Sequence, residues 1–382
     1  MHTLILTGPG GAGTSTLAAA AAVRAAGAGR TTLLLTRQPS PVAGLADVPG
    51  LEVRTVDAGG AVERFWGAAV VPAAATLPQV TLPPASSVAS LPGTAELALF
   101  AELGQARAEL VVVDAGSSEQ AAALLALPAT LRWWLDRLLP PGMRALGALR
   151  SAAVTSGAAR RGPVDAALAL VPELEALLAA DRLADTTGTV VCLAAVPRAG
   201  TAAPLRGLVT ALGLHGLRPA AVLARVLPED DAGEWWRARL EEQTAELTSL
   251  EQLAPVHRVP EGATGPANVE GVAALLEDVV LPEDGGLPAP ATERLDGAWQ
   301  LTVPLPFAER GAVGLTRWED DLVVTVAGTR RSLRLDPLLR RCEVTGGRLA
   351  DPASADARLV VSFRPDPQLW PAELLASVRR SS

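Results

Sequence analysis

Near the start of the chain, four glycines within residues 8–13 separate two runs of very different character. The apolar run Leu4-Ile5-Leu6 precedes them, and an alanine-rich run over residues 17–22 follows. An apolar run bounded by glycine predicts a buried strand, and the alanines predict a helix because alanine has the highest helix propensity. The chain is therefore expected to open with a strand, a glycine loop and a helix, the first unit of an α/β sheet.

The loop itself, residues 8–16, reads Gly-Pro-Gly-Gly-Ala-Gly-Thr-Ser-Thr. Phosphate-binding loops follow the pattern G-x-x-x-x-G-K-[ST], in which backbone N–H groups and the lysine hold phosphates and the Ser or Thr binds magnesium. Ser15 fills the magnesium position, but Thr14 stands where the lysine belongs. The candidate residues for binding ATP or ADP are Gly8, Gly10, Gly11, Gly13, Thr14, Ser15 and Thr16.

The lysine cannot come from elsewhere in the chain, because all 33 basic residues are arginine. Arg37 and Arg132 are the two candidates for replacing its charge. A second magnesium ligand is expected at Asp114, which ends the apolar run 109–114, since an aspartate at the carboxyl end of such a strand can reach the ion. The alternative for Asp114 is a strand-end aspartate that caps the following turn.

Composition excludes several classes of function. With 382 residues, 49% of them apolar, the chain can bury a large core, and its net charge of −8 argues against a nucleic-acid or membrane-surface binder. Neither a transmembrane helix nor a signal peptide is predicted. Cys192 and Cys342 are the only cysteines, which excludes a disulfide framework and a C-x-x-C zinc site. We expect a cytoplasmic protein with two reduced thiols.

Strand and helix patterns alternate as far as residue 281, which predicts an α/β domain with a mainly parallel sheet flanked by helices. Residues 282–295 are rich in Pro and Gly and are expected to form a linker. Residues 296–364 contain short alternating strands, which predict a small β-sandwich. Residues 365–382 are expected to form a tail that ends in two arginines and two serines.

The loop resembles the G-K-G-G-x-G-K-[ST]-T loop of the arsenite-pump (ArsA) and tail-anchored-protein-targeting (Get) ATPases, a family of P-loop proteins. Further segments resemble that family in the same order, and residues 301–363 resemble the small-heat-shock (α-crystallin-like) domain that some bacterial members carry. The segments in the first domain are residues 38–41, 91–97, 112–120 and 222–228.

The same comparison shows departures from the family pattern. Pro9 and Thr14 replace both loop lysines, Gln38 replaces the water-positioning aspartate, and Ala224 replaces the base-reading asparagine. Losing a preorganised cation costs a few kcal/mol of transition-state stabilisation, roughly a hundredfold in rate. We therefore expect no catalytic residue and a pseudo-ATPase that acts as a binding, regulatory or chaperone-like subunit. The alternative is an ATPase whose hydrolysis is weak or completed by a partner.

The resemblance also implies partners. Members of this family dimerise, so a homodimer or a heterodimer with an active paralogue is expected. The adjacent tryptophan pairs, 133–134 and 235–236, either mark a surface for a hydrophobic protein client or pack in the core and at its rim. No arsenite site is expected, because the chain lacks a cysteine triad.

Overall fold

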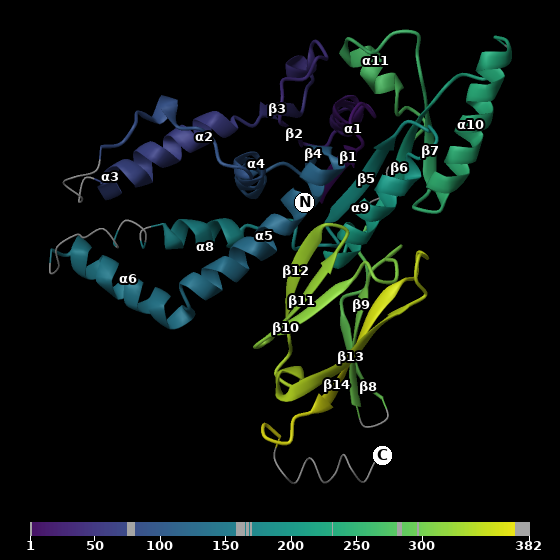
Figure 1. Ribbon diagram of the computed structural model, residues 1–382. Helices are drawn as coiled ribbons and strands as arrows, with labels where there is room; N and C mark the ends of the chain where they lie inside the picture. The colour runs from purple at the N-terminus through teal and green to yellow at the C-terminus, as the bar shows by residue number, and fades with distance from the viewer. Residues whose placement is uncertain are drawn as a thin grey trace.

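The computed structural model describes residues 2–74, 81–157, 165, 168, 170–230, 232–280, 285–295 and 298–370. Two parts are visible in Figure 1: an α/β domain, which includes all the helices labelled there, and a β domain built from the last strands, β8 to β14. The two arginines expected at the end of the tail lie outside the described residues.

The α/β domain contains a seven-stranded parallel sheet in the order β3-β2-β4-β1-β5-β6-β7. The central strands are buried along their whole length, as expected of a parallel sheet covered on both faces. This confirms the fold class predicted for the first domain. The strands are β1 (His2–Gly8), β2 (Thr32–Thr36), β3 (Leu51–Thr55), β4 (Leu110–Ser117), β5 (Thr189–Ala195), β6 (Pro219–Val226) and β7 (Val256–Pro260).

Helices cover both faces of this sheet. The core on one face includes residues of α1 and α11, and the core on the other includes residues of α4, α5, α9 and α10. The helices are α1 (Thr14–Gly27), α2 (Ala58–Phe65), α3 (Val71–Ala74), α4 (Thr94–Gln105), α5 (Ser118–Leu138), α6 (Pro141–Thr155), α8 (Val171–Ala179), α9 (Ala202–Leu214), α10 (Glu234–Glu251) and α11 (Val269–Ala274).

Helix α5 is longer than the sequence pattern predicts. The sequence pattern predicts a helix over residues 119–126 and then an amphipathic segment over residues 131–135, but one helix spans both and continues through Pro128. Pro128 is buried in the helix, so packing offsets the hydrogen bond that a helical proline cannot donate. The consequence is one continuous 21-residue helix that starts after the strand end held by Thr7 and carries Arg137, near its own end, to the β domain.

The β domain consists of a three-stranded antiparallel sheet, β10-β11-β12, and a four-stranded antiparallel sheet, β13-β14-β9-β8. Within the expected linker 282–295, residues 291–295 form β8 and pair with β9. Strand β13 was not predicted from the sequence. The strands are β8 (Ala291–Leu295), β9 (Ala298–Pro304), β10 (Gly314–Trp318), β11 (Asp321–Val326), β12 (Thr329–Arg334), β13 (Cys342–Ala350) and β14 (Arg358–Pro365).

Where the two domains meet, each places an apolar side chain in the core of the other. Leu214, at the end of α9, belongs to the core of the β domain, while Phe307 of the β domain packs in the core beneath α5 and α9. The Thr210 hydroxyl donates a 2.7 Å hydrogen bond to the Pro306 carbonyl, and a Cβ built on Gly213 would lie 2.4 Å from Pro306 Cδ. Docking therefore needs a glycine at position 213 of α9.

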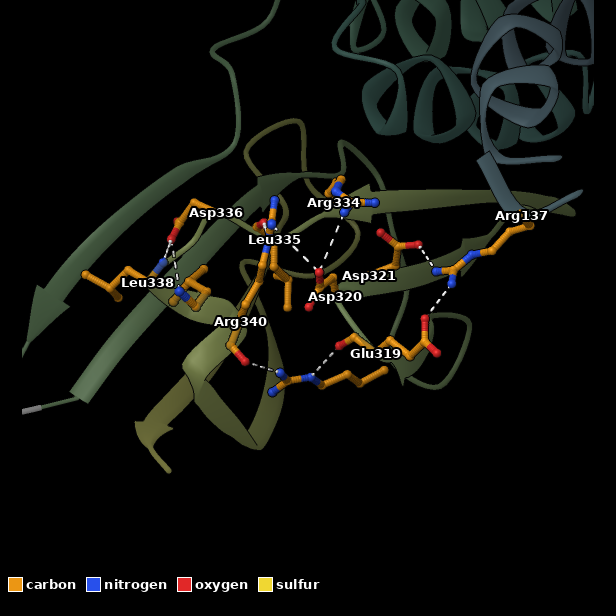
Figure 2. Close-up of polar contacts among 11 residues, drawn as sticks. Arg137, Glu319, Asp320, Asp321, Arg334, Leu335, Asp336, Leu338 and Arg340 are labelled. Atoms are coloured by element: carbon orange, nitrogen blue, oxygen red, sulfur yellow. Dashed lines mark hydrogen bonds and ion pairs between the residues drawn. The ribbon is translucent and has the colours of Figure 1, made fainter. Parts of the chain in front are cut away.

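Arg137, near the end of α5, adds a polar contact to this interface (Figure 2). Its guanidinium lies between Glu319 and Asp321, with Nη2 2.7 Å from Asp321 Oδ2, and it also stacks 5.7 Å from the centre of the Trp133 ring. The two carboxylates hold the pKa of Arg137 above its usual range, chiefly through the hydrogen bond with Glu319. Charge complementarity thus fixes the β10–β11 turn against the end of α5.

His215 at the same interface predicts a dependence of stability on pH. Burial, with the nearby charge of Arg331, lowers the pKa of His215 from 6.5 to about 4. Because the unfolded chain then binds a proton that the folded chain does not, stability is full above pH 6.5 and is lost as the pH falls toward 4. Between pH 7.5 and 5 we expect His215 to cost roughly 1–2 kcal/mol.

The measurement is urea unfolding of the wild type and of His215→Phe at both pH values. The variant should lose less stability on acidification than the wild type by that amount. An identical loss in the two proteins would show that His215 does not carry this dependence.

A search of the described helices for a segment long and apolar enough to cross a membrane finds none.

Candidate functional site

The glycine loop lies at the carboxyl end of β1, in the middle of the sheet. Gly11 and Gly13 adopt φ angles of +81° and +87°, in the left-handed region that favours glycine. The Ala12 N–H donates to the Pro9 carbonyl, and the Leu17 N–H donates to the carbonyl of Gly13, which is the N-cap of α1. Among the residues that the structure describes, no side chain caps this N-terminus. The first N–H groups of α1 and its dipole are therefore available to an anion.

The residues of the loop differ in how deeply they are buried. Gly8 lies against β5, where a Cβ would come 2.2 Å from the Ala194 carbonyl oxygen. Thr14 is buried at 9% exposure, whereas Ser15 is exposed and Thr16 is partly buried. The predicted binding residues thus lie at the end of β1, in the loop and in the first turn of α1, where the residue at the lysine position is buried and the residue at the magnesium position is exposed.

Asp114 lies at the carboxyl end of β4, the strand next to β1, and pairs in register with Leu6. The side chain is buried, and its Oδ1 accepts a hydrogen bond from the Gly116 N–H at 3.1 Å. The Thr7 hydroxyl donates to the Gly116 carbonyl, so the turn formed by residues 114–116 at the end of β4 is tied to the start of the loop. One Asp114 oxygen thus serves the turn; a magnesium role stays a prediction that would use the other.

Helix α5 starts directly after this turn with a capping box. The Gln120 N–H donates to the Ser117 hydroxyl, and the Ser117 N–H donates to the Gln120 side chain at 2.9 Å. These two bonds satisfy backbone donors that would otherwise lack partners at the helix end. The start of α5, residues 117–120, is therefore fixed by its own side chains.

Arg37 follows β2 and brings a cation to this edge of the sheet. Its Nη1 donates to Glu96 Oε1 at 2.9 Å, and its Cδ lies 3.7 Å from the position of a Cβ on Gly116. The Nε and Nη2 groups are buried and have no hydrogen-bond partner in the described residues. Arg37 therefore lies beside the turn that is tied to the loop, with unused donors.

Arg225, at the carboxyl end of β6, lies on the other side of the loop. Its Nη1 is 3.6 Å from the position of a Cβ on Gly13, and its Nε lies 3.4 Å from Glu261 Oε2. Both residues line a cavity of about 180 Å³ together with Gly13, Thr16, Gly262 and residues 264–266. Arg225 lies within the family-like segment 222–228 but was not predicted to be a site residue. The sequence could have indicated Arg225, because this residue lies at the carboxyl end of a buried strand, at the same edge of the sheet as Asp114.

Arg132 does not reach this site, which corrects its proposed role as a replacement for the lysine. It lies 14 residues beyond the start of α5, about 21 Å along the helix axis. Its Nη2 donates to Asp181 at 2.8 Å and to the Leu178 carbonyl at 2.9 Å, so it joins α5 to the segment after α8. Ala224, at the base-reading position, is fully buried in β6 and presents no polar group.

The tryptophan pairs lie at surfaces of different kinds. Trp133 is partly buried and Trp134 is 51% exposed, both beside the β domain; Trp235 is 66% exposed on α10, and Trp236 is partly buried. Within each pair one ring is therefore more buried than the other. No group of three or more His, Cys, Asp or Glu side chains arranged for a metal occurs in the described part of the chain.

A parallel sheet with a glycine loop after its first strand, followed by an antiparallel β domain, defines a P-loop-like α/β protein with an attached sandwich. A family model described as anion-transporting ATPase (ArsA) matches residues 1–278, and one described as an HSP20-like domain found in ArsA matches residues 296–363. The chain belongs to the ArsA family of anion-transporting ATPases. This confirms the family expected from the loop and the β domain.

Two relatives match along nearly their whole length. The chain is 36% identical to the uncharacterized protein SCO2128 of Streptomyces coelicolor, with 97% of this chain and 99% of the relative covered. It is 30% identical to protein Rv2184c of Mycobacterium tuberculosis, with 96% and 97% covered. Both alignments therefore span the two matched parts of this chain.

Proposed function

We propose that this protein is a non-hydrolysing member of its family, a cytoplasmic pseudo-ATPase that binds a nucleotide or phosphate and acts as a regulatory subunit. One observation carries the proposal: the loop keeps the left-handed glycines and the uncapped helix N-terminus, while buried Thr14 occupies the lysine position. Backbone N–H groups can hold a phosphate without that lysine. Transfer of a phosphoryl group depends on the missing charge.

The remaining side chains support binding more than turnover. Gln38, exposed after β2, carries no carboxylate to orient water, and buried Ala224 offers no hydrogen bond to a base. Arg37 and Arg225 supply positive charge on either side of the loop. Weak binding of Mg-ATP or Mg-ADP, with Ser15 and Asp114 as the magnesium ligands, follows from this arrangement.

Calorimetry with Mg-ATP and a phosphate-release assay test the proposal. We expect saturable binding by the wild type without phosphate release above the level of a no-protein control. Thr14→Lys combined with Gln38→Asp should raise turnover by roughly tenfold to a hundredfold over the wild type, because both restored groups act on the transition state. Thr14→Met with Gln38→Asp is the matched control, since methionine is long but uncharged. Steady phosphate release by the pure wild type would overturn the proposal.

A second candidate is an ATPase completed by a partner. Gly10 and Gly11 are exposed, and a Cβ on either would meet nothing within 4 Å, so the outer side of the loop is open to another chain. A second copy or an active paralogue could place a cation there. Phosphate release that appears only when a paralogue with both loop lysines is added, and that persists when the paralogue's own loop is inactivated, would favour this candidate.

A further inference from the structure

The cavity of about 180 Å³ beside the glycine loop lies on the face of the sheet that α1 and α11 cover. Its apolar walls include Leu17 of α1, Val259 of β7 and Leu275, which follows α11, and all three belong to or pack against the core of that face. Gly262 and Gly265, which also line the cavity, are exposed, so one side of it opens to solvent. An apolar cavity of about 150 Å³ accommodates benzene, so this one has room for a flat aromatic ring.

The register of β6 and β7 places Arg225 and Glu261 together on the wall of this cavity. Arg225 pairs with Val259 in the parallel ladder, and the Glu261 N–H donates to the Val226 carbonyl, so the ladder continues to Glu261. Because side chains alternate along a strand, those of Arg225, Val259 and Glu261 project from the same face of the sheet. Val259 packs in the core beneath α1 and α11, so this is the face on which the cavity lies.

The two charged side chains keep unused hydrogen-bonding capacity. Arg225 Nε lies 3.4 Å from Glu261 Oε2, yet the Nε group is buried without a hydrogen-bond partner in the described residues. Within the same residues, no hydrogen bond reaches the Glu261 carboxylate. Each side chain is 37% exposed, so a ligand that enters from solvent can reach both. Arg225 Nη1 lies 3.6 Å from the position of a Cβ on Gly13, so the pair adjoins the glycine loop.

A carboxylate beside a guanidinium selects among the nucleobases. The carboxylate only accepts hydrogen bonds, through two oxygens, and the guanidinium only donates them. Among the four common bases of RNA, guanine alone carries two neighbouring donors on one edge, N1–H and the N2 amino group, with the acceptor O6 beside them. Adenine offers a carboxylate one donor on that edge, the N6 amino group. A carboxylate therefore makes a bidentate, charge-assisted contact with guanine and a single one with adenine.

We propose that this cavity binds the base of a guanine nucleotide, an inference that rests on the proposed binding of a nucleotide at the glycine loop. Glu261 accepts hydrogen bonds from N1–H and the N2 amino group, and Arg225 donates to O6. Buried Ala224, at the base-reading position, contributes no polar group to this recognition. Glu261 is thus the residue that determines base specificity.

Calorimetry on the full chain with Mg-GDP, Mg-ADP, Mg-IDP and pyrophosphate tests this specificity. We expect GDP to bind at least tenfold tighter than ADP, because the carboxylate gains a second charge-assisted bond. IDP lacks the N2 amino group and should bind at least threefold more weakly than GDP. Equal affinities for GDP and ADP would overturn the guanine assignment and leave the proposed function standing, as would binding of pyrophosphate alone. Binding of none of the four ligands would overturn both.

A substitution at Glu261 tests which residue reads the base. Glu261→Gln should weaken GDP binding at least tenfold and should bind xanthosine diphosphate more tightly than GDP, because the amide group can donate to the 2-oxo group of xanthine. The wild type should show the opposite order. Glu270→Gln is the matched control, since Glu270 is exposed on α11 outside the cavity, and should bind GDP within twofold of the wild type. An unchanged preference for GDP in Glu261→Gln would rule out Glu261 as the base-reading residue.

Discussion

Gly8→Ala is expected to destabilise the α/β domain by about 3 kcal/mol or more. The new Cβ would lie 2.2 Å from the Ala194 carbonyl oxygen and 3.0 Å from its carbonyl carbon. Both atoms belong to the backbone of β5, which pairs with β1 as far as Thr7, so neither strand can move without breaking the sheet. Urea unfolding followed by circular dichroism measures the loss, and poor recovery of folded protein would be its extreme form.

Gly10→Ala is the matched control for this prediction. A Cβ at Gly10 meets nothing within 4 Å, and the residue does not have a positive φ angle. Its cost should stay within about 0.5 kcal/mol. Equal losses in the two variants would mean that the loop tolerates no side chain for a reason other than the contact with Ala194.

Arg137→Met is expected to cost about 2 kcal/mol and to weaken the attachment of the β domain. The substitution leaves the Asp321 carboxylate, only 6% exposed, without the charge-assisted bond that Arg137 makes at 2.7 Å (Figure 2). Removing one partner of a buried pair costs more than the pair contributes, because the remaining charge stays desolvated. Calorimetric melting should show a lower midpoint, and the β domain should become accessible to protease first.

A double-mutant cycle with Asp321→Asn separates the pair from other effects of Arg137, including its stacking on Trp133. We expect the double variant to be more stable than the sum of the two single losses implies. Arg144→Met is the control, because Arg144 pairs with Asp136 and Glu175, whose side chains are each 48% exposed, and should cost at most about 1 kcal/mol. A strictly additive cycle would contradict the proposed role of the pair.

Three central strands that the sequence predicts correctly share one property. Residues 4–6, 32–36 and 189–193 are continuous apolar runs, and only burial on both faces of a sheet explains such runs. Strand β8 is exposed at every residue, and β13 contains two adjacent glycines and is mostly exposed, so neither shows an apolar alternation. Pairing with neighbours forms these two strands, and local sequence does not encode that pairing.

The sequence likewise predicted some features of the candidate site and not others. The spacing of glycines predicted the loop, and the position of Asp114 after an apolar run predicted its place at the edge of the sheet. Arg37 and Arg132 could not be told apart by sequence, because both follow apolar segments. The strand order, which places β2 next to β4, brings Arg37 beside Gly116. Arg132 lies far from the glycine loop because it is near the other end of the long helix α5.

By itself the sequence determined the family, the opening strand–loop–helix unit and the absence of any lysine, since these follow from residue identity and local spacing. The tertiary structure decided which arginines flank the loop and which one joins the end of α5 to the β domain. Those outcomes depend on strand order and on how the β domain docks against α5. Both are set by packing between segments far apart in the chain, which no local pattern encodes.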